Sequence, residues 1–147
     1  MSKPKRLVII DTETTGLSVK STHSIIEIAA VEIVNGELSG KEFSTLVNPQ
    51  GRQITHEAFK VHGIKDYELS DAPAFAEIAE KLALFCQGAL VLTYGASFDG
   101  QFLEQEFQRI IILIQTVNWL CYITKMICKN SLSIKAFRCR SSMIKPW

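Results

Sequence analysis

The first third of the chain alternates apolar runs with short polar turns, a pattern that predicts three β-strands. The first strand, Lys5–Asp11, contains the apolar run Leu7–Ile10, whose β-branched side chains are typical of a strand buried on both faces. The second strand is Ser24–Val34 and the third is Glu37–Asn48. Asn35-Gly36 between them is a strong two-residue hairpin signal. We therefore expect an antiparallel meander with the first strand at its inner edge.

Helical patterns follow the meander. Residues 55–64 predict a short helical turn that ends at Gly63, because glycine readily adopts the left-handed conformation that closes a helix. A longer helix is expected to start within residues 70–73 and to run through Cys86, with Asp71 as its N-cap and Pro73 in its first turn. Its apolar side chains recur at helical spacing: Phe75, Ile78, Ala79, Leu82 and Phe85.

A fourth strand and another helix come next. Ala89–Tyr94 is a short apolar run typical of a buried strand, and a helix is predicted from Ser97 onward. Strand, helix, strand and helix after a meander indicate the α/β class. If the first and fourth strands are adjacent and parallel, the sheet is mixed: a three-strand antiparallel meander plus a parallel strand, with flanking helices. Beyond Arg109 the pattern weakens, although Ile110–Ile114 favours β structure.

The charges are distributed unevenly along the chain. All 15 acidic residues lie in residues 1–109 with 10 Lys and Arg, so this part carries 10 − 15 = −5. Residues 110–147 hold 6 Lys and Arg and no acid, which gives +6 and the overall +1. We therefore divide the chain into a domain, 5–109, and an aberrant basic tail of uncertain structure. Within the domain, Glu27 and Glu32 are expected to face solvent or to be structural.

Composition limits the class of protein. The hydrophobic fraction of 47% and the charged fraction of 21% are ordinary for a globular domain. The four cysteines show neither a CxxC pair nor zinc-site spacing, which favours reduced thiols and a cytoplasmic location. We expect no signal peptide, because the apolar run after the basic N-terminus is too short and ends in Asp11. We also expect no membrane contact, because the longest later apolar stretch, Ile110–Ile123, is interrupted by polar residues and is too short to span a bilayer.

Carboxylates stand at the ends of two predicted strands. Asp11 and Glu13 are two positions apart, which places both on one side of the first strand, and Asp99 follows the fourth strand. Parallel neighbouring strands would bring all three to one sheet edge, where one or two Mg²⁺ or Mn²⁺ ions would offset their repulsion. The plainer alternatives are a solvated strand end for Asp11 and Glu13, and a carboxylate at a helix N-terminus for Asp99. Thr14-Thr15-Gly16 offers backbone donors and a glycine suited to close approach by a ligand.

Three motifs in sequence order carry a resemblance to a known family: Asp11–Gly16, Val61–Ile64 and Ala96–Asp99 followed by Phe102-Leu103. Together they resemble the DEDD superfamily of 3′–5′ exonucleases over about residues 6–109, and especially its branch of proofreading epsilon subunits of bacterial DNA polymerase III. The resemblance implies a ribonuclease H-like fold that is incomplete at the C-terminus. It also implies two Mg²⁺ or Mn²⁺ ions held by the catalytic carboxylates Asp11, Glu13 and Asp99.

The resemblance further implies a substrate and a partner. The reaction would be hydrolysis of the terminal phosphodiester at the 3′ end of single-stranded DNA by two-metal-ion catalysis. The protein would proofread DNA for the catalytic subunit of a replicative DNA polymerase. Substrate contacts would come from residues in or beside the motifs: Thr14, Thr15, Gly16, Leu17, His62, Phe98 and Phe102.

The chain departs from the family pattern in two places. Tyr94 and Gly95 stand where the family has histidine and asparagine. The third motif, a general-base histidine followed five residues later by an aspartate, is absent, since His62 is the last histidine in the chain. This indicates a truncated or frameshifted member. Three functions therefore stay open: a DNA exonuclease, an impaired remnant that at most binds metal or nucleic acid, and an RNA-directed exonuclease.

Overall fold

The computed structural model describes residues 6–18, 22–95 and 97–113. The expected tail beyond residue 113 therefore lies outside the described residues. In chain order the elements are four strands, three α-helices and one 3₁₀ helix: β1 (Arg6–Thr14), β2 (Ile25–Val34), β3 (Glu37–Leu46), α1 (His56–His62), η1 (Asp66–Leu69), α2 (Phe75–Cys86), β4 (Leu90–Thr93) and α3 (Asp99–Leu113).

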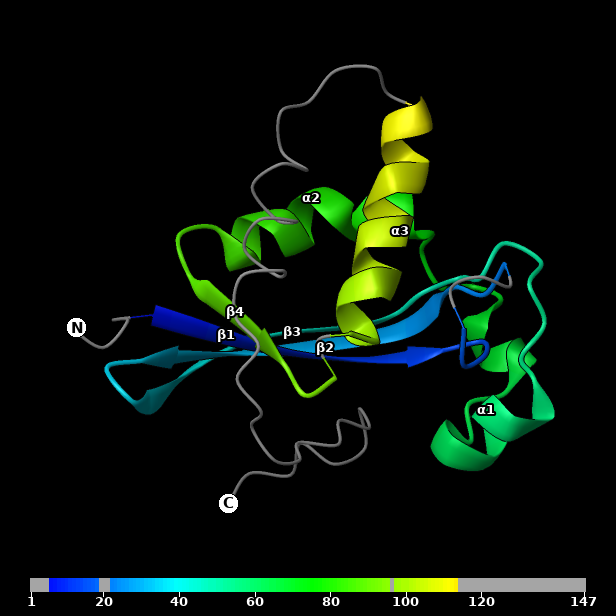
Figure 1. Ribbon diagram of the computed structural model, residues 1–147, viewed down its shortest axis with the longest axis horizontal. Helices are drawn as coiled ribbons and strands as arrows, with labels where there is room; N and C mark the ends of the chain where they lie inside the picture. Colours follow the sequence, from blue (N-terminus) through cyan, green and yellow to red (C-terminus); the bar gives the residue numbers. More distant parts are fainter. Residues whose placement is uncertain (1–5, 19–21, 96, 114–147) are drawn as a thin grey trace.

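The strands form one mixed sheet in the order β3-β2-β1-β4 (Figure 1). β1 and β2, and β2 and β3, pair antiparallel, whereas β4 lies parallel to β1. Asn35 and Gly36 both have positive φ, 54° and 94°, as a two-residue hairpin of the favoured hand requires. The predicted meander and the predicted parallel neighbour of its first strand are both confirmed.

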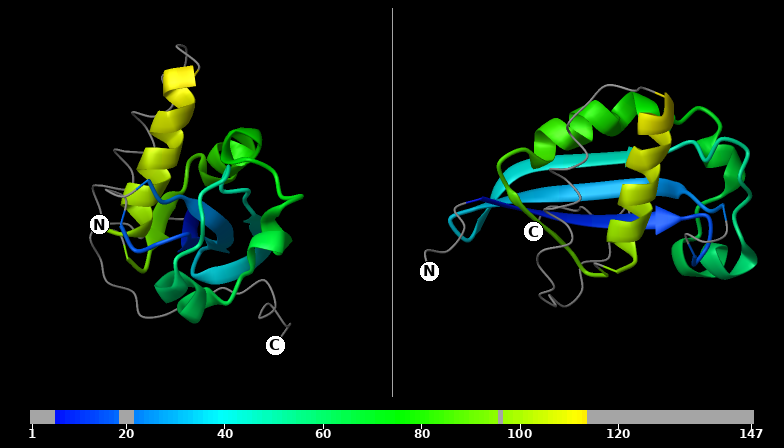
Figure 2. Two further views of the ribbon diagram at one scale, coloured as in Figure 1. Left: turned by 90° about the vertical axis from the view of Figure 1, so that its right-hand side faces the viewer. Right: turned by 45° about the horizontal axis from the view of Figure 1, so that its top comes forward.

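Helices α2 and α3 pack on one face of the sheet (Figures 1 and 2). Val8 and Ile10 of β1 point into this core and are buried, together with apolar side chains of both helices. Leu7 and Ile9 point to the opposite face and are only half-buried. The prediction that the first strand is buried on both faces is therefore wrong, because the core formed with α2 and α3 lies on one side of β1.

The start of α2 differs from the prediction. The helix begins at Phe75 with Ala74 as its N-cap, so Asp71 is not the cap and Pro73 precedes the first turn. The Glu77 side chain accepts the backbone N–H of Ala74 at 2.7 Å and so closes the helix end. The preceding segment is held by Asn48, whose side chain donates to the carbonyls of residues 69 and 70 and whose backbone N–H donates to that of residue 73. These long-range bonds delay the helix by several residues.

The bounds of α3 also differ from the prediction. The backbone N–H groups of Phe98 and Asp99 donate to the Gly95 carbonyl, so a tight turn precedes the helix and α3 begins at Asp99 rather than Ser97. The helix then continues through Leu113, so residues 110–113 are helical and the expected β structure is wrong. Among the described residues, no helix has the combination of length and apolarity that crossing a bilayer requires.

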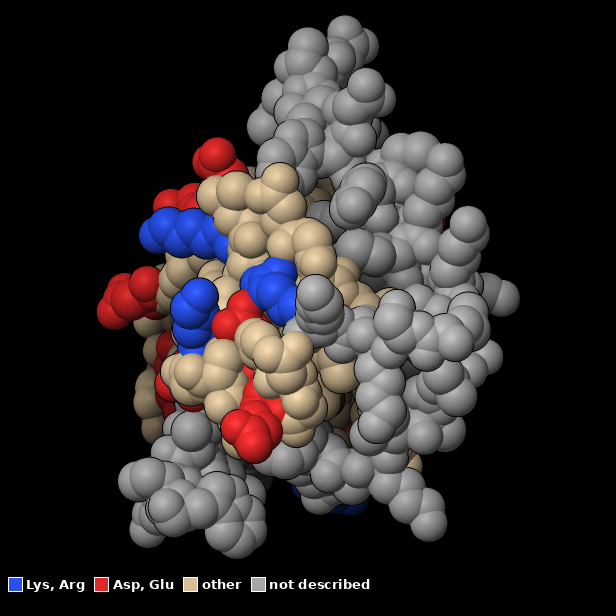
Figure 3. Space-filling view, turned by 90° about the vertical axis from the view of Figure 1, so that its left-hand side faces the viewer, with Lys and Arg blue, Asp and Glu red and all other residues tan. Residues whose placement is uncertain are grey.

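Both glutamates of β2 are buried rather than solvent-facing. The guanidinium of Arg6 donates to Glu32 and to the carbonyls of Phe85 and Gln87, so it joins β1, β2 and the end of α2. Hydrogen bonds from the Ser39 and Arg6 side chains hold the pKa of Glu32 below its ordinary value. On the face shown in Figure 3, acidic and basic side chains of the described residues are interspersed and form no uniformly basic patch.

Candidate active site

The site lies where β1 extends beyond β4. The last residue pair between these strands is Ile10 with Thr93, whereas β1 continues to Thr14 with β2 as its partner. Residues 11–14 therefore have one edge that β4 does not cover. This difference in strand length opens a space next to the two carboxylates of β1.

Asp99 is buried at the first turn of α3, with 4% of its surface exposed. The Thr12 hydroxyl donates to its Oδ1 at 2.6 Å, and the Gly95 backbone N–H donates to its Oδ2 at 3.1 Å. Burial raises the pKa of Asp99, and the nearby charge of Asp11 acts in the same direction, while the bond from Thr12 opposes both. The sequence analysis did not identify Thr12 as a site residue. Thr12 stands between Asp11 and Glu13, so it points to the opposite face of the strand, and this alternation is the signal that places it toward α3.

A pocket of about 640 Å³ brings most of the predicted site residues together. Seven of the ten predicted residues line it: Asp11, Glu13, Thr14, Leu17, His62, Phe98 and Asp99. The lining also includes residues that were not predicted as site residues: Thr12, Ala58, Val61, Tyr94 and Gly95. The lining of the pocket therefore combines carboxylates with apolar side chains.

Three predicted substrate contacts lie outside this lining. Thr15 is fully buried and its hydroxyl accepts the backbone N–H of Ser24 at 3.1 Å. Gly16 is covered by the His23 ring, since a Cβ at this glycine would lie 2.3 Å from Nε2. Phe102 is a core residue with 1% exposure that contacts the Phe98 ring at a centroid distance of 4.9 Å. Thr15 and Gly16 therefore contribute to the structure of the loop after β1, and Phe102 packs in the core against Phe98 of the pocket lining.

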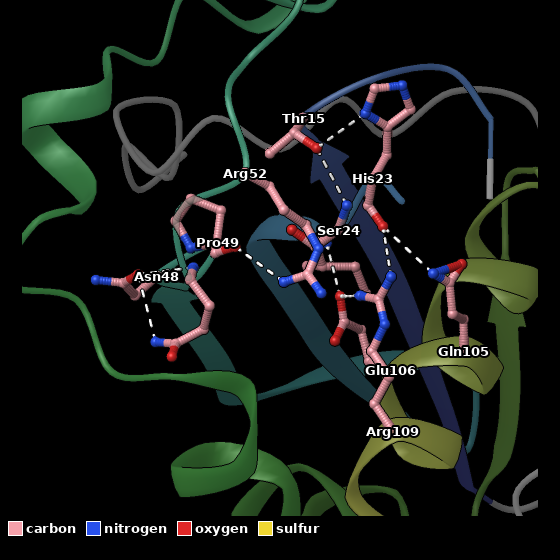
Figure 4. Close-up of polar contacts among 11 residues, drawn as sticks. Thr15, His23, Ser24, Asn48, Pro49, Arg52, Gln105, Glu106 and Arg109 are labelled. Atoms are coloured by element: carbon pink, nitrogen blue, oxygen red, sulfur yellow. Dashed lines mark hydrogen bonds and ion pairs between the residues drawn. The ribbon is translucent and has the colours of Figure 1, made fainter. Parts of the chain in front are cut away.

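A polar network holds the end of this loop against α3 (Figure 4). The His23 carbonyl accepts hydrogen bonds from Arg109 at 3.1 Å and from Gln105 at 3.4 Å. Glu106, which is buried, accepts the backbone N–H of Ile25 at 3.2 Å and pairs with Arg109 at 2.9 Å. Helix α3 therefore positions Asp99 at its first residue and the loop that follows β1 near its other end.

Helix α1 supplies part of the pocket lining through Ala58, Val61 and His62. Thr55 caps this helix, and its backbone N–H donates to the Thr15 carbonyl at 2.8 Å, which ties α1 to the end of β1. Gly63 ends the helix at φ 69°, as predicted. His62, the last helical residue, is buried, and its Nδ1 accepts the backbone N–H of Ile64 at 2.9 Å. In the neutral ring the proton therefore resides on Nε2, so His62 is a hydrogen-bond donor.

The three carboxylates suit a hard divalent cation by their chemistry, because Mg²⁺ and Mn²⁺ prefer oxygen ligands. A cation would also offset the burial of Asp99 and the nearby charge of Asp11, both of which raise the pKa of Asp99. Among the described residues, however, no three His, Cys, Asp or Glu side chains are gathered closely enough to hold an ion as they stand. Thr12 and Gly95 hold the two oxygens of Asp99, and the three carboxylates are not gathered around one point, so sharing an ion requires side chains to reorient.

Sequence comparison identifies relatives of the chain. A family model described as Exonuclease matches residues 8–140. DNA polymerase III subunit epsilon of Buchnera aphidicola (subspecies Schizaphis graminum) is 39% identical over 127 residues, which cover 84% of this chain and 54% of that protein. The Escherichia coli subunit epsilon is 40% identical over 123 residues, covering 81% and 50%. The chain therefore spans about half the length of the curated relatives it matches.

Structural comparison agrees on the fold. Apo exonuclease I superposes with a TM-score of 0.66 at 18% identity, covering 73% of this chain and 25% of that chain. A metal-free complex of Escherichia coli exonuclease I with single-stranded DNA gives 0.65 at 18% identity, covering 71% and 24%. These likenesses agree with the ribonuclease H-like mixed sheet expected from the sequence. The family match runs beyond Arg109, where the sequence suggested a domain boundary, and that boundary stays a prediction. Because the family model matches most of the chain, the protein belongs to the exonuclease family.

Proposed function

We propose that the pocket is the active site of a metal-dependent 3′–5′ exonuclease that hydrolyses the terminal phosphodiester of single-stranded DNA. The observation that carries this proposal is that Asp11, Glu13 and Asp99 line one pocket together with an apolar wall. A nucleotide matches both sides of such a pocket, because its phosphate requires positive charge beside the carboxylates and its base can lie against apolar side chains.

The carboxylates would hold the ions. Mg²⁺ or Mn²⁺, two ions in the family's pattern, supplies the positive charge that polarises a phosphodiester and acidifies water when bound. Thr12 and the Gly95 backbone hold the Asp99 carboxylate at the start of α3, so side chains would have to reorient for Asp11, Glu13 and Asp99 to share an ion. The pairing of β1 with β2 extends as far as Thr14 and holds the backbone at Asp11 and Glu13, so both side chains stay on the same face of the strand.

The apolar side chains of the lining would bind the 3′-terminal nucleotide. Leu17 lies on the exposed loop after β1, and Val61 and Phe98 line the same pocket from α1 and the start of α3. The neutral His62 ring carries its proton on Nε2 because Nδ1 is already an acceptor, and a movement of the ring toward the pocket would let it donate to an oxygen of the sugar or phosphate. The Thr14 hydroxyl donates to the Gly16 carbonyl at 2.7 Å and so holds the loop that carries Leu17.

A polymerase partner is part of the proposal. The curated relatives are named as epsilon subunits of DNA polymerase III, and the solved exonuclease I structure was obtained with single-stranded DNA. By analogy, this chain would act on single-stranded 3′ ends beside a polymerase catalytic subunit in the cytoplasm. The chain covers only part of these relatives, so association with a polymerase should be measured directly by co-purification with a catalytic subunit.

The test is nucleotide release from a 5′-labelled DNA strand in Mn²⁺. We expect successive shortening from the 3′ end, and a loss on the order of 100-fold or more in Asp11→Asn, since this change removes a metal ligand worth several kcal/mol. Asp66→Asn, on exposed η1 outside the pocket, is the matched control. A ribonucleotide strand of the same sequence tests the RNA-directed alternative.

A melting experiment separates the enzyme from the impaired remnant. If Mn²⁺ raises the melting temperature of the wild-type chain and of Asp66→Asn but not of Asp11→Asn, the pocket binds metal. Metal binding without nucleotide release would refute the enzymatic proposal and favour a binding remnant. Release that persists in Asp11→Asn would show that the activity arises elsewhere.

A further inference from the structure

Tyr94 occupies an unusual place at the rim of the pocket. It is the first residue after β4, directly beyond the last β1–β4 pair, Ile10 with Thr93, and it lines the same pocket as Asp11. Its side chain is 60% exposed. Among the described residues it takes part in none of the ring contacts, hydrogen bonds or ion pairs. A large aromatic surface therefore faces the pocket, and no hydrogen bond, ion pair or ring contact with another described residue accounts for its position.

The surroundings of Tyr94 favour one kind of ligand. Leu17 and Val61 also line the pocket and are 62% and 51% exposed, so three large exposed side chains border a pocket that contains carboxylates. An apolar ligand alone would not require the carboxylates, and a free anion would not use the apolar border. A nucleotide chain satisfies both, because each base offers an aromatic face and its phosphates can share the divalent cations of the proposed function with the carboxylates.

We propose that Tyr94 is a substrate-binding residue that stacks on a nucleobase of the bound single strand. This inference rests on the proposed function and adds a contact that the sequence motifs do not predict. Stacking on a tyrosine tolerates any base, since every base has a π-face, so Tyr94 would add affinity without sequence preference. The ring and not the hydroxyl makes the contact, so phenylalanine should replace it.

The experiment measures binding of a 5′-fluorescein-labelled oligothymidylate by anisotropy, with Ca²⁺ in place of Mg²⁺ and at one fixed salt concentration, because such binding depends strongly on salt. We expect Tyr94→Ala to weaken binding roughly 5- to 10-fold, which is the lower part of the range for loss of one stacked base. Tyr94→Phe should bind within about twofold of wild type. Tyr67→Ala is the matched control, because Tyr67 is 69% exposed on η1 and lies outside the pocket.

A set of strands with single abasic sites identifies the contact. The wild-type chain should lose affinity when one particular position near the 3′ end lacks its base, and Tyr94→Ala should be insensitive to that loss. Unchanged binding by Tyr94→Ala, or equal sensitivity of both proteins at every abasic position, would overturn the proposal. Equal melting temperatures of the two proteins exclude a folding defect as the cause of weaker binding.

The two proposals fail in different ways. Binding in Ca²⁺ does not depend on hydrolysis, so a wild-type chain that binds through Tyr94 but releases no nucleotide in Mn²⁺ supports this inference and refutes the proposed activity. If the wild-type chain releases nucleotides and Tyr94→Ala does so with the same KM, the result supports the proposed activity and refutes this inference. A wild-type chain that does not bind the strand refutes the inference as well.

Discussion

The pair Phe98 and Phe102 offers a direct test of the border between core and pocket. The rings are in contact at 4.9 Å, but Phe102 is 1% exposed within the core, whereas Phe98 is half-buried and lines the pocket. We expect Phe102→Ala to lower the free energy of unfolding by about 3–5 kcal/mol, because it leaves a closed cavity. Phe98→Ala should cost about 1 kcal/mol, since half of a side-chain burial is lost and the space opens into an existing pocket.

Urea unfolding followed by far-UV circular dichroism measures both values. Stabilities of small domains are about 5–15 kcal/mol, so Phe102→Ala removes a large share, and Phe102→Leu provides a milder variant that remains folded. Per folded molecule, Phe102→Leu should bind substrate like the wild type, whereas Phe98→Ala should bind it more weakly. Equal destabilisation by the two alanine variants, or a loss below about 1 kcal/mol in Phe102→Ala, would refute the placement of Phe102 in the core.

Three further changes test features of the fold. Hydrogen bonds from Ser39 and Arg6 lower the pKa of Glu32 below its ordinary value of 4.5. The ionised Glu32 side chain therefore stabilises the fold above pH 4.5, and this stabilisation is lost as the pH falls through the lowered native pKa. The melting temperature of Glu32→Gln should lie below that of the wild type at neutral pH and approach it in acid. Burial raises the pKa of the Cys86 thiol from 9.0 to about 12, so between these pH values the thiol ionises only in the unfolded chain. The melting temperature of the wild type should therefore fall toward that of Cys86→Ala as the pH rises through this range. Gly63→Ala should cost about 1 kcal/mol in urea unfolding, because Gly63 has φ 69° and alanine is strained there.

Local patterns were sufficient to predict most of the sheet. The Asn35-Gly36 turn fixes the hairpin because both residues adopt positive φ, and the apolar run of Leu7–Ile10 marks β1. The i, i+2 spacing of Asp11 and Glu13 places both on one side of the strand, and both line the pocket. Asp99 follows β4, and it could be predicted to lie near Asp11 and Glu13 once β4 was taken as parallel to β1. The structure contains that parallel pairing.

Features that depend on contacts distant in sequence could not be predicted. The late start of α2 follows from hydrogen bonds of Asn48 to a segment more than twenty residues away. Burial of Glu32 depends on Arg6, which is 26 positions earlier in the chain. The wall formed by α1 depends on the bond between the Thr55 N–H and the Thr15 carbonyl. These partners are too far apart in the sequence for a local pattern of apolar and polar residues to relate them. The pattern therefore placed the candidate carboxylates on the strand ends but did not predict which residues of α1 line the same pocket.

The position of His62 bears on how water could be activated in this chain. His62 lines the pocket with the three carboxylates, but its Nδ1 accepts the Ile64 N–H, and the neutral ring therefore carries its proton on Nε2. A general base needs a free lone pair directed at the water, and in the neutral ring Nδ1 is already occupied by the Ile64 N–H while Nε2 carries the proton. His62 is thus suited to binding an oxygen and not to replacing the general-base histidine of the family's third motif. On the proposed function, we therefore predict that hydrolysis depends on the three carboxylates and on added Mn²⁺. The rate of nucleotide release should follow the metal concentration, and His62→Gln should raise KM without lowering kcat.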